Sequence, residues 1–533
     1  MRFLPVGPHT VLIELPDLAA TLALHDALVA DPVGGIAEII PAARTLMIRT
    51  AQDVPVDAAL AQQIAQRRQT AAVARVEAAA EPVEVPVVYG GEDLADVAQH
   101  MGLSVAEVIA AHQAAIWQVA FCGFAPGFAY LSGNDPRFNL PRRATPRSRI
   151  PAGAVALAAE FSGIYPKDSP GGWQLIGTTD LLMWDLARDP PALLQPGMRV
   201  RFVKAGGEVG PRHMARSTPC PQAPAAGAVA AGSPPSPALT VISTPFPLLF
   251  QDEGRIGQAG QGVSVSGAMD LPALRRANRA VGNPANAAAL EITLGPVRLR
   301  ADAPITLALT GAATVRIPGQ QIAAGSAFCL DPGDLMTIDP PKAGMRSYLA
   351  LRGGYAVAPV LGSCATDMLA FVGPAPVASG AVLEAAKRPA CAVGMAEHQP
   401  ALPRPGDLVE LPVTLGPRTD WFSPDLVQLF LTQHWLVTPQ SSRVGIRLQG
   451  DQPLLRGDAR ELPSEGTEYG AIQVPHSGQP VLFLADHPLT GGYPVIATLH
   501  PSALALAGQI PPGARIRFTA LAPFAPFTLA ELT

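Results

Sequence analysis

The spacing of hydrophobic residues alternates between strand-like and helix-like periods over the first 78 residues. VLIEL (11–15) predicts a strand, and DLAATLALHDALVA (17–30) repeats its apolar positions with helical spacing. GIAEIIPAARTLMIRT (35–50) predicts two strands about a proline turn, and DAALAQQIAQRRQTA (57–71) predicts a second amphipathic helix. The order strand, helix, strand, strand, helix predicts a small α+β domain over residues 1–78.

From residue 79 onward, short strand-like runs dominate the pattern. VEVPVVYGG (83–91) predicts a strand and precedes two helix candidates, DLADVAQHMG and SVAEVIAAHQAAIWQ. After residue 118 the apolar runs are short and are separated by turn residues, which is typical of strands. The same pattern continues after residue 239, with short helical stretches at 271–281 and 423–433. The sequence therefore predicts a mainly β protein.

Two segments from different halves of the chain share one pattern. Residues 153–178 and 470–498 both run from a Gly-Ala strand start, through a loop, to Gly-Gly-aromatic, two residues, then Ile-small-Thr. This repeat predicts related β units in the two halves. The alternative is a chance match in a glycine-rich chain.

The stretch PQAPAAGAVAAGSPPSPA (221–238) contains no charged residue and consists mostly of alanine, proline, glycine and serine. Such a composition buries too little apolar surface to order itself, so we predict a linker over residues 216–238. The linker separates a first part, which ends near residue 215, from a second part over 239–533.

Length, composition and charge narrow the class of protein. A chain of 533 residues predicts about three or four domains, and its 57 prolines argue against long helices. The net charge of −5 leaves no dominant basic face, so nucleic acid is not an expected partner. No apolar run reaches the ~18 residues of a membrane span, and prolines and acids interrupt the N-terminal stretch where a signal peptide needs apolar residues. We therefore expect a cytoplasmic protein without a membrane partner.

The five cysteines are scattered and form no C-x-x-C pair, which disfavours a zinc site or a disulfide framework. Cys122 is a candidate nucleophile within FCGFAPGFAYLSG (121–133), where four aromatic residues stand beside three glycines and a proline. A small buried apolar residue is the favoured interpretation. The sequence has no P-loop, no G-x-S-x-G elbow, no H-E-x-x-H pair and no biotinyl-lysine motif.

Five arginines fall within PRFNLPRRATPRSR (136–149), and the intervening prolines prevent a single helical charge stripe. Arginine forks bind carboxylates and phosphates through paired hydrogen bonds, so an anion clamp beside the FCGFAPGFAYLSG segment is one interpretation. A solvated loop or a contact between subunits is the other, and the residues alone favour neither.

Acidic residues in glycine-bounded turns form a second group of candidates. QDEGRIG (251–257) places Asp252 and Arg255 beside glycines, and SGAMD (266–270) ends at Asp270. Such carboxylates serve as general bases or metal ligands, and they also hydrogen-bond their own turns. On the residues alone, the turn interpretation is favoured.

A third group follows the apolar run VLFLA. LADHPLTGGYP (484–494) contains Asp486 and His487, followed by Gly491 and Gly492. Polar residues after a strand are often catalytic, and glycines let backbone amides approach a ligand. The adjacent Asp and His alone are weak evidence, because neighbours on a strand point to opposite faces.

Many of these motifs together resemble a known pair of families. HTVLIEL, VPVVYGGEDLADVA, GFAPGFAYL, PAGAVALA and GIYPKDSPGGWQLIGTT resemble the allophanate hydrolase subunit 1 family, also called the 5-oxoprolinase B-type family. QDEGRIG, GVSVSGAMD, ANRAVGN, LEITLG, LRGGY, LGSCATD, RVGIRLQG and IQVPHSGQPVLFLADHPLTGGYP resemble the subunit 2 family, the 5-oxoprolinase C-type family. The chain therefore resembles a fusion of both subunits.

The resemblance implies a fold and a domain plan. Cyclophilin-like β-barrels are expected, preceded by the small α+β domain of residues 1–78. The first barrel would occupy residues 79–215, and residues 239–533 would form two barrel-like lobes.

The resemblance also implies three activities. The first is ATP-dependent opening of 5-oxo-L-proline to L-glutamate, shared with a separate A-type subunit. The second is the carboxyltransferase-like part of a biotin-dependent urea or amide carboxylase, and the third is regulation of a sensor histidine kinase. The first ranks highest, because it lacks only one partner, whereas the second lacks a biotin carboxylase and a carrier. Fusion at a fixed ratio would also blunt a regulator built from two opposing proteins.

For this activity, the implied ligands are a small-molecule substrate and ATP with Mg²⁺ as co-substrate, with no biotin attached to this chain. We expect Arg142, Arg143 and Arg147 to supply positive charge, and the turn at Gly123 and Gly127 to supply backbone amides. The predicted binding residues also include Arg255, Gly491 and Gly492.

The predicted catalytic residues are all polar groups of the second part. Asp486, Asp252 or Asp270 would act as a base or hold Mg²⁺, and His487 would be a proton shuttle. No complete set of metal ligands is assigned. The arginine loop, if it joins two copies of the chain, would allow a homo-oligomer.

Overall fold

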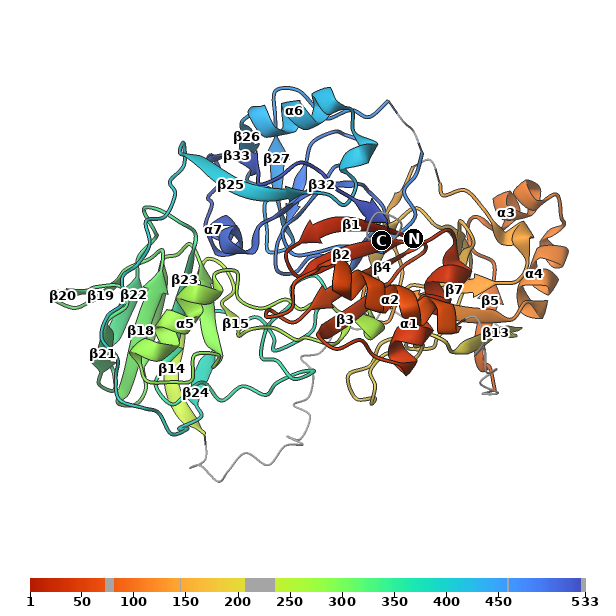
Figure 1. Cartoon of the computed structure of the whole chain (residues 1–533). Helices are drawn as coiled ribbons and strands as arrows, with labels where there is room; N and C mark the ends of the chain where they lie inside the picture. Colours follow the sequence, from red (N-terminus) through yellow and green to blue (C-terminus); the bar gives the residue numbers. More distant parts are fainter. Residues whose placement is uncertain (72–80, 144, 207–234, 458–459, 529–533) are drawn as a thin grey trace.

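The computed structural model describes residues 1–71, 81–143, 145–206, 235–457 and 460–528 (Figure 1). The chain contains a small α+β domain, a closed β-barrel, a domain of two larger sheets and a second closed barrel. Most of the predicted linker 216–238 lies outside the described residues, as does Cys220, and β14 (Ser236–Ser243) begins inside the linker's range. In the described ranges, no helix is long and apolar enough to cross a membrane.

The N-terminal domain packs two helices against a five-stranded sheet with the strand order β3-β4-β2-β1-β34. Its elements are β1 (Arg2–Gly7), β2 (Thr10–Glu14), α1 (Leu18–Ala30), β3 (Ile36–Pro41), β4 (Thr45–Thr50), α2 (Ala58–Ala71) and β34 (Phe527–Thr528). Helix α1 begins where the Asp17 carboxylate accepts a hydrogen bond from the backbone N–H of Ala20 (2.8 Å). Leu24 of α1 and Ile48 of β4 share the core between the helices and the sheet.

The fifth strand of this sheet comes from the opposite end of the chain. β34 runs antiparallel to β1, with Phe527 opposite Phe3 and Thr528 opposite Arg2. The two phenylalanine rings stack with 4.9 Å between their centroids. The predicted domain 1–78 therefore gains a strand from beyond its own range.

Replacing Phe527 with alanine should weaken this attachment, because the stacked ring pair and its buried area are lost. We expect a loss of about 1–2 kcal/mol in the local opening free energy of β1. Hydrogen exchange at the amides of β1 measures it, and the exposed residue Leu521, changed to alanine, is the control. Unchanged protection of β1 in the Phe527 variant would contradict the assignment.

The two barrels have the same strand order. The first closes as β5-β12-β9-β10-β7-β6-β13 and the second as β25-β32-β29-β30-β27-β26-β33, each through one parallel pair. The first-barrel elements are β5 (Val83–Tyr89), α3 (Leu94–Met101), α4 (Val105–Ala114), β6 (Trp117–Cys122), β7 (Ala129–Gly133), η1 (Pro136–Phe138), β8 (Arg147–Ile150), β9 (Ala154–Ala158), β10 (Phe161–Ile164), β11 (Ser169–Gly171), β12 (Gln174–Thr178) and β13 (Arg199–Lys204). The second-barrel elements are β25 (Leu408–Leu415), η3 (Thr419–Trp421), α6 (Pro424–Thr432), β26 (Trp435–Val437), β27 (Gly445–Gln449), β28 (Glu465–Gly466), β29 (Ala471–Gln473), β30 (Val481–Phe483), β31 (Thr490–Gly491), β32 (Val495–Leu499), η4 (Pro501–Ala503), α7 (Leu504–Ala507) and β33 (Arg515–Ala520).

Equivalent side chains occupy equivalent places in the two barrels. The indole N–H of Trp117 donates to the carbonyl of His112 (3.2 Å), and that of Trp435 donates to the carbonyl of Phe430 (3.0 Å). The two repeated sequence segments run from β9 to β12 and from β29 to β32, at matching positions in the strand order. The predicted internal repeat is confirmed, and both barrels match the expected closed β-barrel architecture.

The domain between the barrels consists of two packed sheets. Their strand orders are β20-β19-β22-β17-β14-β24 and β15-β16-β23-β18-β21. Its elements after β14 are β15 (Leu249–Gln251), η2 (Ala259–Gln261), α5 (Leu271–Ala280), β16 (Ala289–Thr293), β17 (Val297–Ala301), β18 (Ile305–Gly311), β19 (Val315–Ile317), β20 (Gln320–Ile322), β21 (Ala327–Leu330), β22 (Leu335–Ile338), β23 (Arg346–Leu351) and β24 (Val382–Ala385). Leu299 and Leu349 belong to the core shared by the sheets, and α5 packs on β18 and β23. Of the two lobes expected in residues 239–533, one is a closed barrel and the other is this pair of sheets.

The N-terminal sheet also joins the two halves of the chain. Leu12 and Met47, on the sheet face opposite the helices, share an apolar cluster with Leu489 of the second barrel. Beside it, the Arg49 guanidinium donates to Glu468 of the second barrel (2.8 Å) and to Glu38 (2.6 Å). The halves are therefore packed as one body through apolar and charged contacts.

Candidate functional site

The FCGFAPG turn of the first barrel lies at a seam with the second half of the chain. The backbone N–H of Phe124 donates to the Thr490 hydroxyl of the second barrel (3.1 Å). The N–H of Gly127 donates to the carbonyl of Gln261 in the two-sheet domain (3.0 Å). The turn thus connects three of the four units, and we call this contact region the seam.

Both glycines of the turn have a steric reason to be glycine. A Cβ on Gly123 would overlap Thr490, lying 2.7 Å from its Cγ2, and Gly127 has a φ of 75°. The amides of Gly123 and Gly127 are already donated to protein carbonyls. That these two glycines present amides to a ligand remains a prediction. In the structure, both lie in the seam, where Gly123 faces Thr490 and Gly127 bonds to Gln261.

The aromatic residues of this segment form a packed layer beneath the turn. Phe128 and Tyr130 are buried and meet edge to face with 5.1 Å between centroids, and Trp173 packs against both. Cys122 is buried, and burial raises the pKa of its thiol to about 12. A thiol that stays protonated is a poor nucleophile, so the structure agrees with the apolar interpretation of Cys122.

A buried polar network lies where the two-sheet domain meets the second barrel. The Arg443 guanidinium donates to both carboxylate oxygens of Asp486 (2.9 Å each) and to Glu291 (2.5 Å). Asp486 also accepts hydrogen bonds from the Ser266 hydroxyl (2.6 Å) and the Met368 N–H (2.9 Å). Asp486 is therefore fully buried and fully paired, which fits a positioning role better than that of a free base.

Asp270 belongs to the same network. Its carboxylate caps helix α5 by accepting from the Ala273 N–H (2.9 Å), and it accepts from the Gln509 amide of the second barrel (2.8 Å). Its own N–H donates to the Tyr348 hydroxyl, which donates to Glu291 (both 2.7 Å). Burial raises the pKa of Asp270, although the Gln509 bond opposes this.

Asp252 holds the loop that follows residue 360. Its carboxylate accepts from the Ser363 hydroxyl (2.5 Å), the Cys364 N–H (2.6 Å) and the Gly254 N–H (2.9 Å). All three donors lie in loop segments next to Asp252 in the sequence or in the fold, so the geometry favours the interpretation that this carboxylate holds its own loop.

His487 is buried apart from the network formed by Arg443 and Asp486. Its Nδ1 lies 2.9 Å from the carbonyl of Pro488, and the ring stacks on Phe483. Burial, with a further contribution from Arg49, lowers the pKa of His487. A buried neutral imidazole can fill a structural position, and its role as a proton shuttle remains a prediction.

The predicted arginine clamp divides into separate parts. Arg143 and Arg147 both bind the buried carboxylate of Asp93, with Arg147 at 2.8 Å to each oxygen. Burial opposes ionisation of Asp93, but these arginines hold its pKa below the usual value. The charges of Arg143 and Arg147 are thus largely neutralised inside the first barrel. Arg142, by contrast, is exposed and lies next to Gly492. Its Nη1 is 3.7 Å from the position that a Cβ on Gly492 would occupy.

Gly491 and Gly492 come directly after Thr490, the second-barrel residue of the seam. Gly491 belongs to β31, which pairs with β28, and a Cβ there would lie 2.7 Å from the Gln473 amide. Their approach to a ligand remains a prediction.

Asp367 and two cations form a second cluster beside the buried network. Asp367 accepts from the backbone N–H groups of Leu369 (2.8 Å) and Ala370 (2.7 Å) through one carboxylate oxygen. Lys167, from the first barrel, donates to the Leu369 carbonyl, and both Lys167 and Arg255 lie within electrostatic reach of Asp367. We call Lys167, Arg255 and Asp367 the interlobe cluster, because both halves of the chain contribute to it.

The pKa values of this cluster are shifted toward neutrality. Burial and the neighbouring Asp486 raise the pKa of Asp367 to about 6. Burial lowers the pKa of Lys167 to about 8, although the negative charge of Asp367 acts to raise it. Groups that titrate near neutral pH are suited to proton transfer, so this cluster is the strongest candidate for acid–base chemistry.

Replacing Asp367 with asparagine tests this shift through stability. The unfolded carboxyl ionises near pH 4, whereas the folded one ionises near pH 6, so wild-type stability falls as pH rises between these values. The variant keeps an acceptor oxygen but not the charge, and should be more stable than wild type by about 1–3 kcal/mol above pH 6. Urea unfolding at pH 4.5 and 7.5 measures the difference, and a variant less stable than wild type at pH 7.5 would contradict the shift.

Sequence reasoning missed four of these residues. They are Lys167, Glu291, Asp367 and Arg443. Each lies within a motif that carries the family resemblance, namely GIYPKDSPGGWQLIGTT, LEITLG, LGSCATD and RVGIRLQG. A charged residue inside such a motif was the available signal. For each of the four, however, the partner or charged neighbour from the other part of the site lies more than 40 residues away.

The predicted Mg²⁺ ligands do not gather into one cluster in the part of the chain that the structure describes. Among the described residues, no group of three or more His, Cys, Asp or Glu side chains is arranged to hold a metal ion. The carboxylates of Asp252, Asp270 and Asp486 already accept hydrogen bonds from the protein. The use of these residues as metal ligands remains a prediction.

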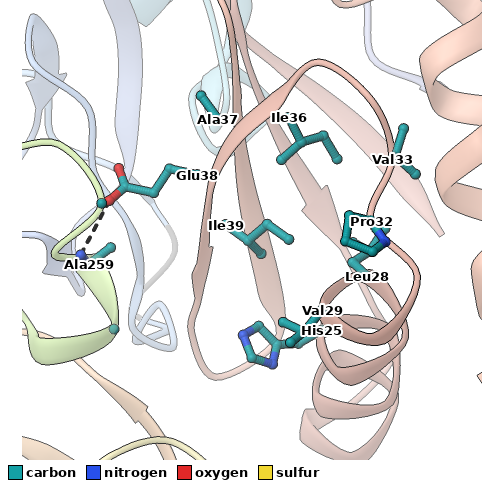
Figure 2. A pocket seen from close by; sticks show the side chains of 12 residues that line it. His25, Leu28, Val29, Pro32, Val33, Ile36, Ala37, Glu38, Ile39 and Ala259 are labelled. Atoms are coloured by element: carbon teal, nitrogen blue, oxygen red, sulfur yellow. Dashed lines mark hydrogen bonds between the residues drawn. The ribbon is translucent and has the colours of Figure 1, made fainter.

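A cavity of about 340 Å³ lies elsewhere, between α1, β3 and the loop 257–260 (Figure 2). Its lining is mostly apolar, and its one carboxylate, Glu38, is occupied by the N–H of Ala259 (3.2 Å) and by Arg49. Because few polar groups converge there, the cavity is a weaker candidate for catalysis than the interlobe cluster.

Two closed barrels with the same strand order, each meeting the two-sheet domain at buried charged groups, give this chain a two-part plan. The family model described as carboxyltransferase domain, subdomain C and D, matches residues 1–194, and the model for subdomain A and B matches residues 261–520. The chain belongs to this family, and its two parts are similar to the B and C subunits of 5-oxoprolinase, respectively.

Individual relatives agree with this assignment. The 5-oxoprolinase C subunit of Escherichia coli (strain K12) is 38% identical over 286 residues, covering 52% of this chain and 90% of the relative. The 5-oxoprolinase B subunit of Escherichia coli O157:H7 is 51% identical over 124 residues, covering 23% of this chain and 57% of the relative. The crystal structure of TTHA0988 is 33% identical with a TM-score of 0.80, covering 96% of this chain and 99% of that one.

Proposed function

We propose that this chain is the combined B and C component of an ATP-dependent 5-oxoprolinase, which opens 5-oxo-L-proline to L-glutamate with a separate A-type subunit. The observation that carries the proposal is the interlobe cluster. Lys167 comes from the B-type half, while Arg255 and Asp367 come from the C-type half. A site with groups from both types gives a physical reason for both types to be required together.

The reaction needs activation because a lactam is a stable amide. Transfer of the γ-phosphoryl group of ATP to the amide oxygen releases ADP and makes the carbon electrophilic. Water then attacks this carbon, the C–N bond breaks as nitrogen takes a proton, and the resulting acyl phosphate is hydrolysed by a second water. The products are glutamate, ADP and phosphate, and each water attack requires a group that accepts a proton.

Asp367 has the chemistry for that proton transfer. Its raised pKa lets it accept a proton near neutral pH, and its second carboxylate oxygen carries only one long contact, from the Ser264 hydroxyl (3.3 Å). Lys167 lies beside it and can return a proton to the departing nitrogen. The Asp486–Arg443 pair would hold the neighbouring loop through the Met368 N–H.

Copurification with the A-type subunit, followed by a substrate panel, tests the proposal. We expect a stable complex that forms glutamate from 5-oxo-L-proline and ATP, and no activity in this chain alone. Turnover of urea or another amide with bicarbonate and a biotinylated carrier, in place of 5-oxo-L-proline, would support the carboxyltransferase-type alternative. If no 5-oxo-L-proline is turned over in the presence of an A-type partner of verified activity, the proposal is contradicted.

A further inference from the structure

Arg255 is a buried cation with unused hydrogen-bond donors. Its side chain is one of the largest fully buried ones, with 2% of the residue exposed. One terminal nitrogen donates to the Ala365 carbonyl, while Nε and Nη1 have no partner among the described residues. A buried guanidinium normally finds acceptors for its N–H groups, so this position calls for an acceptor that the chain does not supply.

None of the surrounding carboxylates accepts a hydrogen bond from Nε or Nη1 of Arg255. Asp252, Asp367 and Asp486 all lie within electrostatic reach of Arg255. Each accepts hydrogen bonds from other donors, including the Ser363 hydroxyl for Asp252 and Arg443 for Asp486. Burial lowers the pKa of Arg255, and the three carboxylates oppose that effect. The free N–H groups therefore face an environment already rich in negative charge.

A second cation approaches from the other half of the chain. Lys167 is half-buried, and its ammonium lies 4.5 Å from the centre of the Phe371 ring. Phe371 is 73% exposed and has a φ of 58°, an uncommon backbone conformation for an aromatic residue. The neighbouring Met368 is also exposed. Two cations and an exposed apolar edge thus meet at the loop 367–373.

The backbone around Arg255 is shaped to leave its guanidinium room. Gly373 has a φ of 110°, and a Cβ there would lie 3.1 Å from Arg255 Nη2. Any larger residue would press on the guanidinium and on the Ala365 carbonyl.

We propose that Arg255, assisted by Lys167, binds the carboxylate of a small monoanionic ring substrate, which under the proposed function is the carboxylate of 5-oxo-L-proline. The planar guanidinium matches a planar carboxylate. Three nearby carboxylates would repel the second charge of a phosphate dianion more strongly than a monoanion, which favours a carboxylate. Phe371 and Met368 offer apolar surface to the ring of the same ligand.

Calorimetric titration of the full chain with 5-oxo-L-proline, without ATP or partner, tests this site. Wild type should bind it, and Lys167→Gln and Arg255→Lys should each weaken binding by about 10- to 100-fold. 2-Pyrrolidinone, which lacks the carboxylate, should bind weakly and equally to all three proteins. Arg275→Gln is the matched control, because Arg275 lies on α5 and, within the described ranges, its ion pair is with the exposed Glu253.

The outcomes separate this site from the proposed function. If both variants bind 5-oxo-L-proline as wild type does, or inorganic phosphate binds more tightly than the carboxylate, the assignment is overturned. Should Arg255→Lys fail to fold by circular dichroism, Lys167→Gln alone decides. Carboxylate binding that depends on both cations, without turnover when the A-type partner is added, would leave the site standing and remove the proposed function.

Discussion

Arg443→Met is expected to lower the free energy of unfolding by about 3–5 kcal/mol. The variant would leave Asp486 and Glu291 buried without the cation that binds both. Methionine fills a similar volume, so the loss would come mainly from the uncompensated carboxylates and less from a cavity. Because Asp486 holds the Met368 N–H, the loop carrying Asp367 should also lose protection from hydrogen exchange.

Arg447→Met is the matched control for this change. Arg447 lies on β27, which begins two residues after Arg443, but Arg447 is exposed. Its replacement should alter stability by less than about 0.5 kcal/mol. Urea unfolding of both variants gives the comparison, and equal effects would show that the buried network does not stabilise this interface.

Gly123→Ala is expected to disturb the seam, with a loss of about 1–3 kcal/mol in stability. The new methyl group would overlap the Thr490 side chain, which is anchored by the Phe124 N–H. Moving the turn would shift the first barrel relative to Thr490 and the interlobe cluster. With the A-type partner present, turnover should therefore fall by at least about 10-fold.

A second substitution distinguishes this steric cause from a loss of backbone freedom. Gly123 does not have a positive φ, so alanine fits its backbone conformation once space is available. Thr490→Ala removes both atoms that the new methyl group would meet most closely. The double variant should be more stable than the sum of the two single changes predicts, whereas strict additivity would contradict the direct contact.

Much of the barrel architecture was readable from local patterns. The repeated segments 153–178 and 470–498 predict related β units, because strand, loop and glycine positions recur in one order. Each barrel also repeats a helix followed by a tryptophan, Trp117 or Trp435, that bonds back to the helix end. Such features depend on residues close in sequence, and therefore leave a pattern.

Pairings between distant segments left no such pattern. Nothing near Phe527 indicates that it completes a sheet with Phe3, more than 500 residues earlier. In the same way, the local run of arginines predicts a clamp, but Arg143 and Arg147 pair with Asp93. The sequence supplies the charged groups, while the tertiary fold decides which charges are already neutralised.

Asp486 illustrates the same limit within the candidate site. Its position after an apolar strand singled it out, and the structure places it at the centre of a buried network. Its oxygens are nevertheless occupied by Arg443, Ser266 and the Met368 N–H. Asp367, which sequence reasoning passed over, has the shifted pKa that proton transfer requires.

The central claim is that the two halves of this chain together act with an A-type partner to open 5-oxo-L-proline. The most direct measurement follows ADP and glutamate together in a mixture of the intact chain, a verified A-type partner, ATP and 5-oxo-L-proline. We predict equal amounts of ADP and glutamate, formed only when both proteins are present and strongly reduced by Gly123→Ala. ATP hydrolysis that does not depend on 5-oxo-L-proline, or no glutamate with a verified partner, would contradict the claim.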